Sequence, residues 1–468
     1  MRGEQRMQRA SARWGAAVLA LLVSALASPA PAATNFPMPP AIRPQVDFWI
    51  GVFATYSRRQ DIIHDTEHLD RIYTVLDFRD LEAQGVSPGQ IDALMRTRED
   101  EEKNRIRAML FRLQEDPDPS TLTAEELRLQ GMFANDPSPT KFMDAASPDR
   151  LRGQRGLRER FAQGIAIAHG YFPYMEEIFR RNGVPVEITR LPLVESTFNM
   201  KAYSKVGAAG VWQFMPGTAR HFMRVDDVID ERLDPLVATA AAATFMRQNY
   251  DKLGTWPLAI KAYNHGPAGM ARAVRDTGTT DIAIIIQNYK GPAFKFASRN
   301  FYPEFLAAVH VERNHRKYFG DIDLNPPLRS ETVILSNPMS ITTAARCADA
   351  DVFSITDLNP GLLPPIRTGR IAIPPGYSLR VPAGDADNFR RCAVTQPVYE
   401  MARRATERRN TAAHGRVGSS ARVHRVQRGQ TLASIAARYG CTVAQIRRGN
   451  SLKSGTVRTG QLLRIPPC

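Results

Sequence analysis

Residues 156–318 carry apolar side chains at spacings of three and four over almost their whole length, which is the pattern of amphipathic helices. Residues 161–180 fit one such helix, and the Asn-Gly pair that follows would end it. Residues 238–250 are rich in alanine, whose small side chain permits close contact between helices. We therefore expect an all-α globule with bounds at residues 156–325.

Residues 43–155 are expected to form a helical region that supports this globule. Apolar residues recur there at helical spacing, first through Ile62, Leu69, Ile72, Val75 and Leu76 and again through Ile91, Leu94, Ile106 and Leu110. His64 and His68 would share one helical face, as in a zinc site, but the zinc-protease pattern needs Glu after the first His, and Asp65 stands there. An ordinary polar helix start is the favoured interpretation, and we expect no metal site.

The pattern changes beyond residue 325. Short apolar pieces such as residues 332–335 and 370–373 are separated by Pro and Gly, which is typical of short strands. We expect a small α+β module at residues 330–383. Residues 396–421 are rich in Arg and poor in large apolar groups, so they cannot bury enough surface to offset the entropy of ordering. This basic linker either attracts an acidic polymer or acts as a solvated spacer.

Residues 422–468 have the pattern of a compact β-α-α-β unit. The expected order is strand, helix, helix and strand, at residues 424–426, 431–439, 442–448 and 462–465. The expected fold class is therefore mainly α with small α+β units. A chain of 468 residues is long enough for two or three folded domains.

Residues 1–32 have the layout of a signal peptide. Several arginines precede an apolar run at residues 16–27, and small residues end at Ala32, where we expect cleavage. The apolar run is shorter than the roughly 20 residues that cross a bilayer, and no later stretch is long and uncharged enough, so we expect no transmembrane segment. No cysteine precedes Cys347, so we expect no lipid anchor. The expected location is the periplasm.

Four cysteines, Cys347, Cys392, Cys441 and Cys468, lie in the last third of the chain. An even number in an exported chain indicates disulfides, and four cysteines allow three pairings. We favour Cys347 with Cys392 and Cys441 with Cys468. The formal net charge of +15 favours polyanionic surroundings, which could be nucleic acid, anionic lipid or an acidic cell wall. Export argues against nucleic acid as a partner.

Glu195 is the candidate for chemistry, because it follows the apolar segment 191–194 and is therefore a candidate for partial burial. Burial raises a carboxyl pKa, and a carboxyl group that stays protonated near neutrality can act as a general acid toward a glycosidic oxygen. Alone this signal is weak, since a Glu at a helix end is usually a solvated surface residue. We expect no cofactor.

Two further stretches have the composition of a sugar-binding groove. The small residues 207–210 would let backbone approach a sugar closely, and the amides of Gln213 and Asn264 suit acetamido and hydroxyl groups. Tyr203 and Tyr263 can stack on sugar faces. Taken singly, the glycines are better explained by a plain turn and each tyrosine by a place in the core, but the set favours a binding site.

Together these motifs resemble, in order and spacing, those of the soluble lytic transglycosylase catalytic domain, which has a lysozyme-like α fold. The stretches are Glu195-Ser196, Ala202-Tyr203-Ser204, residues 207–219 and residues 262–267. The nearest resemblance is to the membrane-bound lytic murein transglycosylase D type. It implies that Glu195 is catalytic and that the substrate is bound by Ser196, Tyr203, Ser204, Gln213, Met215, Tyr263, Asn264, Phe301 and Tyr302.

The chain departs from the family near the end of this domain. Phe301 stands where the family has a tyrosine, and Tyr302 is the candidate to replace the missing hydroxyl. The resemblance also implies a single catalytic carboxylate, whereas ordinary glycosidases use two. Five acidic residues downstream could in principle supply a second, but we interpret them as loop and helix-start charges: Asp226, Asp227, Asp230, Glu231 and Asp234.

The C-terminal unit resembles a LysM domain, a module that binds chains containing N-acetylglucosamine. Its expected glycan-binding residues are Gly429, Thr431, Leu432 and Asn450, and the alternative is a small fold without a ligand. Residues 330–383 resemble a degenerate LysM-like module. One such module binds weakly, but its link to a catalytic domain raises the local substrate concentration.

The resemblance implies a lytic transglycosylase that cleaves the MurNAc-GlcNAc β-1,4 bond of peptidoglycan glycan strands. Glu195 would act first as acid and then as base, which leaves a 1,6-anhydroMurNAc end. The alternatives are a hydrolytic muramidase and a non-catalytic peptidoglycan-binding protein.

Overall fold

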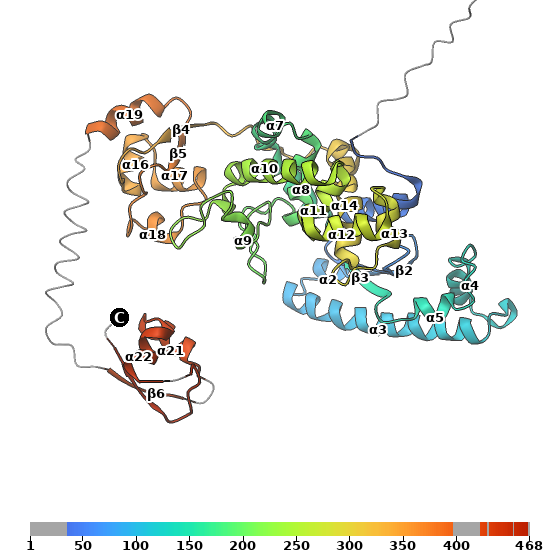
Figure 1. Cartoon of the computed structure of the whole chain (residues 1–468). Helices are drawn as coiled ribbons and strands as arrows, with labels where there is room; N and C mark the ends of the chain where they lie inside the picture. Colours follow the sequence, from blue (N-terminus) through green and yellow to red (C-terminus); the bar gives the residue numbers. More distant parts are fainter. Residues whose placement is uncertain (1–34, 396–421, 428–429, 453, 467–468) are drawn as a thin grey trace, which may run out of the picture. The chain divides into compact units, whose positions relative to one another are not determined.

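The computed structural model describes residues 35–395, 422–427, 430–452 and 454–466. The expected signal peptide and the basic linker lie outside them. The described residues belong to two compact units, one made of residues 35–199 and 239–325 and the other of residues 200–238 and 326 onward (Figure 1). The expected fold class is confirmed, because within these ranges helices dominate and the sheets are small and antiparallel. Among the described residues, no helix has the length and apolarity needed to cross a bilayer.

A three-stranded antiparallel sheet lies in the first unit, where the sequence predicted helix. Its strands are β1 (Gln60–Asp65), β2 (Ile72–Asp77) and β3 (Leu151–Arg155), in the order β2-β1-β3. Ile62 pairs with Val75 on one side and with Gln154 on the other. The helical prediction is wrong here because β1 is buried over most of its length, polar residues included, so it lacks the alternation of apolar and polar residues that marks a half-buried strand.

Helices surround this sheet. α1 (Arg43–Ala54) contacts α14 (Phe296–Arg313), and α3 (Pro88–Glu115) begins at a capping box in which Ser87 and Gln90 satisfy each other's backbone amides. Figure 1 shows α5 (Lys141–Ala145) lying along α3. The remaining elements of this region are η1 (Pro40–Ile42), α2 (Arg79–Ala83), η2 (Pro119–Thr121) and α4 (Ala124–Gly131).

The single helix predicted at residues 161–180 is two helices, α6 (Arg158–His169) and α7 (Phe172–Arg181). Pro173 favours the break, because proline has no backbone N–H and is preferred in the first turn of a helix, where it stands in α7. The other helices of this unit are η3 (Val186–Arg190), α8 (Leu191–Ser196), α11 (Trp256–His265), α12 (Pro267–Thr277), α13 (Ile282–Asn288) and α15 (His315–Phe319). α10 (Pro235–Leu253) contains the predicted alanine-rich helix.

His64 and His68 do not share a helical face, and the polar helix start expected there is also absent. His64 belongs to strand β1, is fully buried, and its ring centroid lies 4.5 Å from that of Phe48. Desolvation lowers the pKa of His64 to about 4, so the imidazole is neutral. His68 follows the strand in a turn. Among the described residues no group of three or more His, Cys, Asp or Glu is placed to hold a metal ion.

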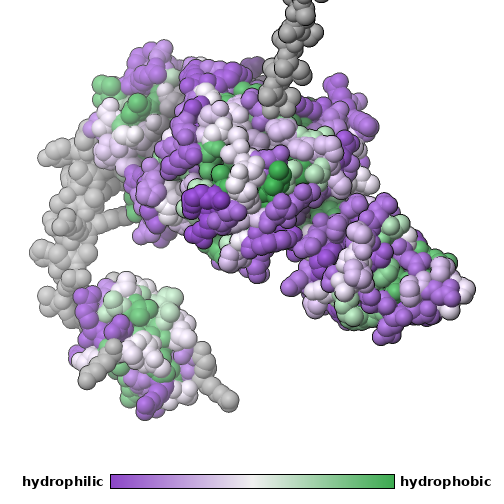
Figure 2. Space-filling view, turned by 45° about the vertical axis from the view of Figure 1, so that its right-hand side comes forward, coloured by the Kyte–Doolittle hydropathy of each residue, from purple (hydrophilic) through white to green (hydrophobic). Residues whose placement is uncertain are grey.

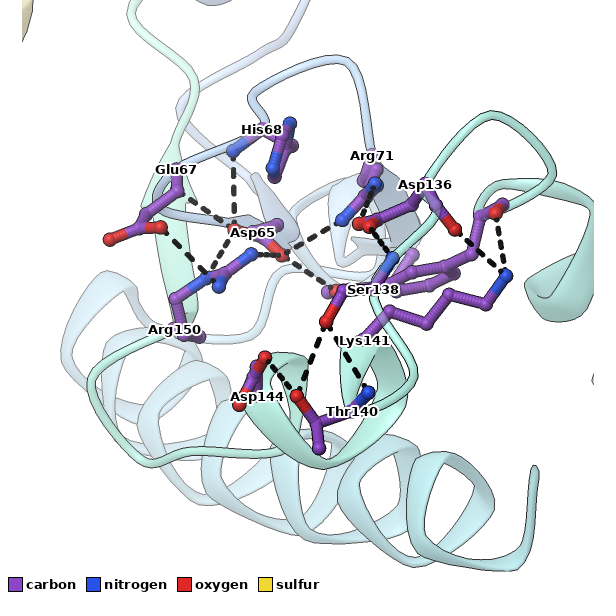
Figure 3. Close-up of polar contacts among 12 residues, drawn as sticks. Asp65, Glu67, His68, Arg71, Asp136, Ser138, Thr140, Lys141, Asp144 and Arg150 are labelled. Atoms are coloured by element: carbon purple, nitrogen blue, oxygen red, sulfur yellow. Dashed lines mark hydrogen bonds and ion pairs between the residues drawn. The ribbon is translucent and has the colours of Figure 1, made fainter. Parts of the chain in front are cut away.

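A buried ionic cluster replaces the predicted helix start. Arg150 donates to both oxygens of Asp65 at 2.8 and 2.6 Å, and Tyr73 donates to Asp65 Oδ2 at 3.2 Å. Figure 3 shows Asp65 between Arg150 and Arg71, and Arg71 in turn pairs with Asp136 at 2.8 Å. Burial acts to raise the pKa of Asp65, but its hydrogen bonds with Arg150 hold it below the usual value. The cluster fixes the loops around the sheet.

The second unit contains a small α+β module. Its strands β4 (Ser330–Ile334) and β5 (Ser378–Pro382) pair antiparallel, and its helices are α16 (Ile341–Cys347), α17 (Val352–Leu358), α18 (Pro364–Arg367) and α19 (Ala386–Thr395). The strand predicted at residues 370–373 is wrong, since only Ile373 makes an isolated bridge there. Two prolines directly follow Ile373 and have no N–H to continue a ladder.

The predicted disulfide between Cys347 and Cys392 is confirmed and joins α16 to α19. Cys468, the expected partner of Cys441, lies outside the described residues, so that pair stays a prediction. A disulfide across 45 residues restricts the unfolded chain, and its loss typically costs about 2–5 kcal/mol.

Replacing both Cys347 and Cys392 with alanine is therefore expected to lower the unfolding free energy of this module by about 2–5 kcal/mol. Hydrogen exchange at the paired amides of β4 and β5 measures this local stability, and these amides should exchange faster in the double variant. Unchanged exchange there would show that the disulfide does not stabilise the module.

The C-terminal part has the predicted β-α-α-β order. Its elements are β6 (Arg422–Arg425), α21 (Leu432–Tyr439), α22 (Val443–Gly449) and β7 (Leu462–Ile465), and β6 pairs antiparallel with β7. Their small core contains Val426, Ile435, Ile446 and Leu463.

The same asparagine contact occurs in both small modules. Asn450 donates to the carbonyls of Ile446 and Arg464, at 2.8 and 2.7 Å, and accepts from the amide of Arg464 at 2.6 Å. Asn359 makes the equivalent three bonds to Ile355 and Arg380. In each module the asparagine ties the end of the second helix to the last strand, so the two modules share a local design.

Candidate active site

Glu195 lies in the last turn of the short helix α8. The helix ends because Thr197 and Phe198 take left-handed backbone conformations, with φ of 49° and 54°. Their amides donate to the carbonyls of Leu193 and Pro192, at 3.1 and 3.0 Å, and so close the helix end. Two successive non-glycine residues in this region store strain, which the surrounding structure must hold in place.

Two neighbouring contacts hold this strained turn. Phe198 is fully buried, with its ring centroid 5.7 Å from that of Tyr171 and 6.3 Å from that of Phe172. Gly164 of α6 lies so close that a Cβ atom there would stand 2.5 Å from the carbonyl oxygen of Thr197. Glycine is therefore needed at position 164, and the turn after Glu195 is packed on both sides.

The Glu195 side chain is half-buried, and its pKa is raised to about 8. Desolvation is the main cause, and the negative charge of Glu304 adds to it. At pH 7 the carboxyl group therefore carries a proton. This is the state that a general acid needs before it reacts.

Glu304 is the residue that the sequence analysis missed. It lies on α14, which packs against both α8 and α11, and burial raises its pKa to about 8 although Lys261 and Arg152 oppose the rise. Its neighbours Phe301, Tyr302 and Phe305 are buried core residues. A carboxyl group within such an apolar helical stretch is a signal that could have identified it.

Lys261 is a second unforeseen charged group in this region. Its side chain is fully buried on α11, and its Nζ lies 4.4 Å from the centre of the Phe294 ring. Among the described residues Nζ has no hydrogen-bond partner. Desolvation lowers the pKa of Lys261 to about 7, and the charge of Glu304 opposes this. Lys261 and Glu304 therefore influence each other's ionisation.

The predicted groove residues of the first unit fall into two groups. Tyr263 is half-buried, and burial together with the Glu195 charge raises its pKa, which indicates that the two side chains are near each other. Asn264 is exposed and accepts a 3.1 Å hydrogen bond from Ser298. Phe301 and Tyr302 are instead buried, and the Tyr302 hydroxyl donates to the carbonyl of Pro37 at 2.8 Å. The structure thus gives these two residues places in the core.

Ser196 has a local role in the same unit. Its hydroxyl donates to the Pro192 carbonyl at 3.3 Å and accepts from the amide of Asn199 at 3.2 Å. The first bond lies within α8 and the second in the turn that follows it, so Ser196 joins the end of the helix to that turn.

The predicted residues Tyr203, Ser204, Gln213 and Met215 belong to the second unit. Tyr203 and Met215 are 56% and 43% exposed, whereas Gln213 is half-buried with φ of 49° and donates from its side chain to the Gly210 carbonyl at 2.8 Å. The hydroxyl of Ser204 accepts from the amide of Ala208 at 2.9 Å. These bonds form a compact turn that presents an aromatic ring and a thioether to solvent. Residues 203–215 are called the glycine loop below.

The acidic residues that follow the glycine loop are held by arginines and backbone amides. Asp226 accepts from the amides of Val228 and Ile229 and from Arg224, while Asp230 binds Arg232 through both oxygens. Burial acts to raise the pKa of both carboxyl groups, but these partners keep it below the usual value. The expectation that they are loop charges agrees with these contacts.

The residues expected to bind glycan in the C-terminal module have structural contacts. Thr431 and Ser434 form a capping box at the start of α21, Leu432 is buried, and Asn450 makes the helix-to-strand contact described above. Gly429 lies outside the described residues.

Known protein families match two parts of this chain. The family described as "Transglycosylase SLT domain" matches residues 174–286, and the LysM domain matches residues 424–466. The chain contains a transglycosylase SLT domain. The SLT match includes Glu195, the glycine loop and Tyr263, but it ends before Glu304.

Individual proteins are also similar to this chain. Membrane-bound lytic murein transglycosylase D of Escherichia coli strain K12 is 26% identical over 328 residues, which cover 68% of this chain and 69% of that protein. Soluble lytic murein transglycosylase of Salmonella typhimurium is 35% identical over 79 residues, or 16% of this chain and 12% of that protein.

A solved structure also matches, that of an inactive mutant of the lytic transglycosylase Slt from Pseudomonas aeruginosa. It is 21% identical, with a TM-score of 0.28, over 44% of this chain and 32% of that one. This chain therefore spans about a third of the length of that structure.

Proposed function

We propose that the chain is a lytic transglycosylase that cleaves the MurNAc-GlcNAc β-1,4 bond of peptidoglycan glycan strands. The observation that carries this proposal is the half-buried carboxyl group of Glu195, protonated at neutral pH, within an SLT domain. Its proton passes to the glycosidic oxygen as the bond to MurNAc C1 breaks. The resulting carboxylate takes the proton of the MurNAc C6 hydroxyl, whose oxygen bonds to C1 and forms the 1,6-anhydro ring.

Hydrolysis is the second candidate, because Glu304 places another carboxyl group near Glu195. An inverting hydrolase needs an ionised carboxylate as a general base for water. The pKa of Glu304 is raised to about 8, so at neutral pH this group is protonated like Glu195 and does not supply that base. Because Glu304 supplies no general base for water, ring closure by the substrate's own C6 hydroxyl is favoured over hydrolysis.

The remaining features fit an enzyme of the cell wall. The LysM domain would hold glycan strands, and the formal charge of +15 favours an acidic polymer. Figure 2 shows that hydrophilic residues cover most of the visible face, with apolar residues in small separate groups. We propose the periplasm as its location and peptidoglycan as its partner.

The direct test is incubation of the full chain with purified sacculi and measurement of soluble glycan. A transglycosylase releases soluble fragments, whereas a purely binding protein sediments with the sacculi and releases nothing. Retention without release would contradict the proposal.

Replacing Glu304 with glutamine is expected to move the basic limb of the activity profile to lower pH. Glu195 acts as an acid only while protonated, so activity falls as pH rises through its pKa of about 8. Glu304 ionises over the same range near pH 8, where its negative charge raises the pKa of Glu195, so removal of that charge lowers the pKa of Glu195. The other charged groups near Glu304 are Lys261 and Arg152, and both remain. The measurement is kcat/KM on sacculi as a function of pH.

Glu304→Asp is the matched control, because it keeps the carboxylate and should leave the basic limb near its original position. A Glu304→Gln profile that overlays that of the unaltered chain would contradict the coupling between the two carboxyl groups.

A further inference from the structure

The α+β module, expected at residues 330–383 but extended by α19 to residue 395, is bonded to the segment that follows the glycine loop. The amide of Asp230 donates to the Gly361 carbonyl at 2.8 Å, and the amide of Leu363 donates to the Val228 carbonyl at 3.0 Å. Ile229 and Leu362 form an antiparallel bridge between these bonds. Residues 228–230 thus pair like a short strand with the loop between α17 and α18.

The core of this module includes a side chain from outside it. Ile229 is fully buried in the same apolar cluster as Leu362, Ile366 and Ile373. The module therefore completes its core only when the segment around Ile229 is in place.

A buried ion pair adds a charged connection. Arg380 on β5 pairs with Asp234, and the two side chains are 9% and 3% exposed. Arg380 also donates to the Leu358 carbonyl at 2.8 Å, while Asp234 accepts from the amides of Leu236 and Val237 at the start of α10. Removal of one partner of a buried pair leaves the other charge uncompensated, which is strongly destabilising.

Arg464 takes the same place in the C-terminal module, beside Asn450, as Arg380 takes beside Asn359. Arg464 is exposed, whereas Arg380 is buried against Asp234. The local design is shared, but only Arg380 connects its module to another segment in this way among the described residues.

The connection reaches the glycine loop through Asp230 and Arg232. The Tyr203 hydroxyl donates to Asp230 Oδ2 at 2.9 Å, and Arg232 donates to both oxygens of Asp230 at 2.9 and 2.7 Å. Arg232 also donates to the carbonyls of Gly207 and Phe214, at 2.7 and 3.0 Å. The buried Arg232 therefore joins two points of the glycine loop. Asp230 and Asp234, two residues before and after it in the sequence, are both bonded to the module.

We propose that this α+β module is a brace that positions the glycine loop for substrate, with Arg380 as the positioning residue. This role rests on the proposed function, because the loop carries the candidate sugar-binding residues Tyr203 and Gln213. Arg380 holds Asp234, the paired segment 228–230 holds Asp230, and Asp230 and Arg232 set the shape of the loop. The module works as a fixed part of the substrate site and not as an independent glycan-binding module.

The test uses three variants of the full chain: Arg380→Met, Asp234→Asn and the double variant. Asp234→Asn keeps a side-chain oxygen to cap α10 and removes the charge that faces Arg380, so it separates the ion pair from the cap. Arg367→Met is the matched control, since Arg367 is an exposed arginine of the same module. The readouts are hydrogen exchange of amides in residues 203–215 without substrate, and kcat and KM on sacculi.

Each single variant is expected to speed exchange in the glycine loop by at least about tenfold and to lower kcat/KM by at least about tenfold, mainly through KM. The double variant should be no worse than either single variant, because both act on one pair. Arg367→Met should change neither readout.

Unchanged loop exchange in both single variants would overturn the brace, as would equal effects in Arg367→Met. If the unaltered chain releases nothing from sacculi while exchange still speeds up in the variants, the proposed function fails and the brace stands.

Discussion

Glu195→Gln is expected to lower the release of soluble glycan from sacculi by about 10²–10⁴-fold, the usual contribution of a general acid or base. Glutamine has the shape of the protonated carboxyl group but has no acidic proton to give to the glycosidic oxygen. The fold should persist, because the half-buried site already favours an uncharged side chain. The measurement is the initial rate of release at a fixed pH near 7.

The same substitution should change how stability depends on pH. The pKa of Glu195 is higher in the folded chain than in the unfolded chain, so its contribution is fully present below the ordinary glutamate pKa of 4.5 and is lost as pH rises through about 8. In Glu195→Gln this contribution is absent.

Glu187→Gln is the matched control for the release measurement, since Glu187 pairs with Arg313 at the surface and its replacement should not affect release. Release by Glu195→Gln at the rate of the unaltered chain would remove the catalytic assignment.

Gly210→Ala is expected to destabilise the glycine loop severely. Gly210 has φ of 73°, which is strained for a residue with a side chain, and an added Cβ would overlap the backbone carbonyl of Arg232. The positive φ costs about 1–3 kcal/mol and the overlap about 1–3 kcal/mol more. Since Arg232 binds Asp230 and the loop carbonyls, its displacement should also abolish most activity.

Gly217→Ala supplies the comparison in the same segment. Gly217 has an ordinary φ and nothing within 4 Å of its added Cβ, and it is an exposed residue of helix α9 (Pro216–Ala219). Alanine there should be neutral or stabilising by up to about 1 kcal/mol. Two measurements separate the variants: the free energy of unfolding in denaturant, and the rate of glycan release from sacculi. Equal stability of Gly210→Ala and Gly217→Ala would contradict the account of the loop.

Local patterns predicted the alanine-rich helix and the burial of Glu195. The alanine-rich stretch lies in α10, and Glu195 ends a short helix after an apolar segment with its pKa raised as burial requires. These features depend on residues close together in the chain. Their periodicity and neighbours are visible without a structure.

Features that depend on distant residues were not predictable in this way. Strand β1 reads as helical because β2 and β3 pair with it on both sides and bury it. Glu304 influences Glu195 only because α14 packs against α8. Asp230 and Asp234 looked like loop charges, and the sequence did not reveal that Arg232 and Arg380 neutralise them.

The central claim is that Glu195 acts as acid and then as base, so that the substrate's own hydroxyl closes the product. Mass spectrometry of the fragments that the full chain releases from purified sacculi tests this most directly. The account predicts 1,6-anhydroMurNAc ends, lighter by one water than reducing ends, and almost none of these fragments with Glu195→Gln. Fragments that carry only reducing MurNAc ends would contradict it and assign the chain to hydrolysis.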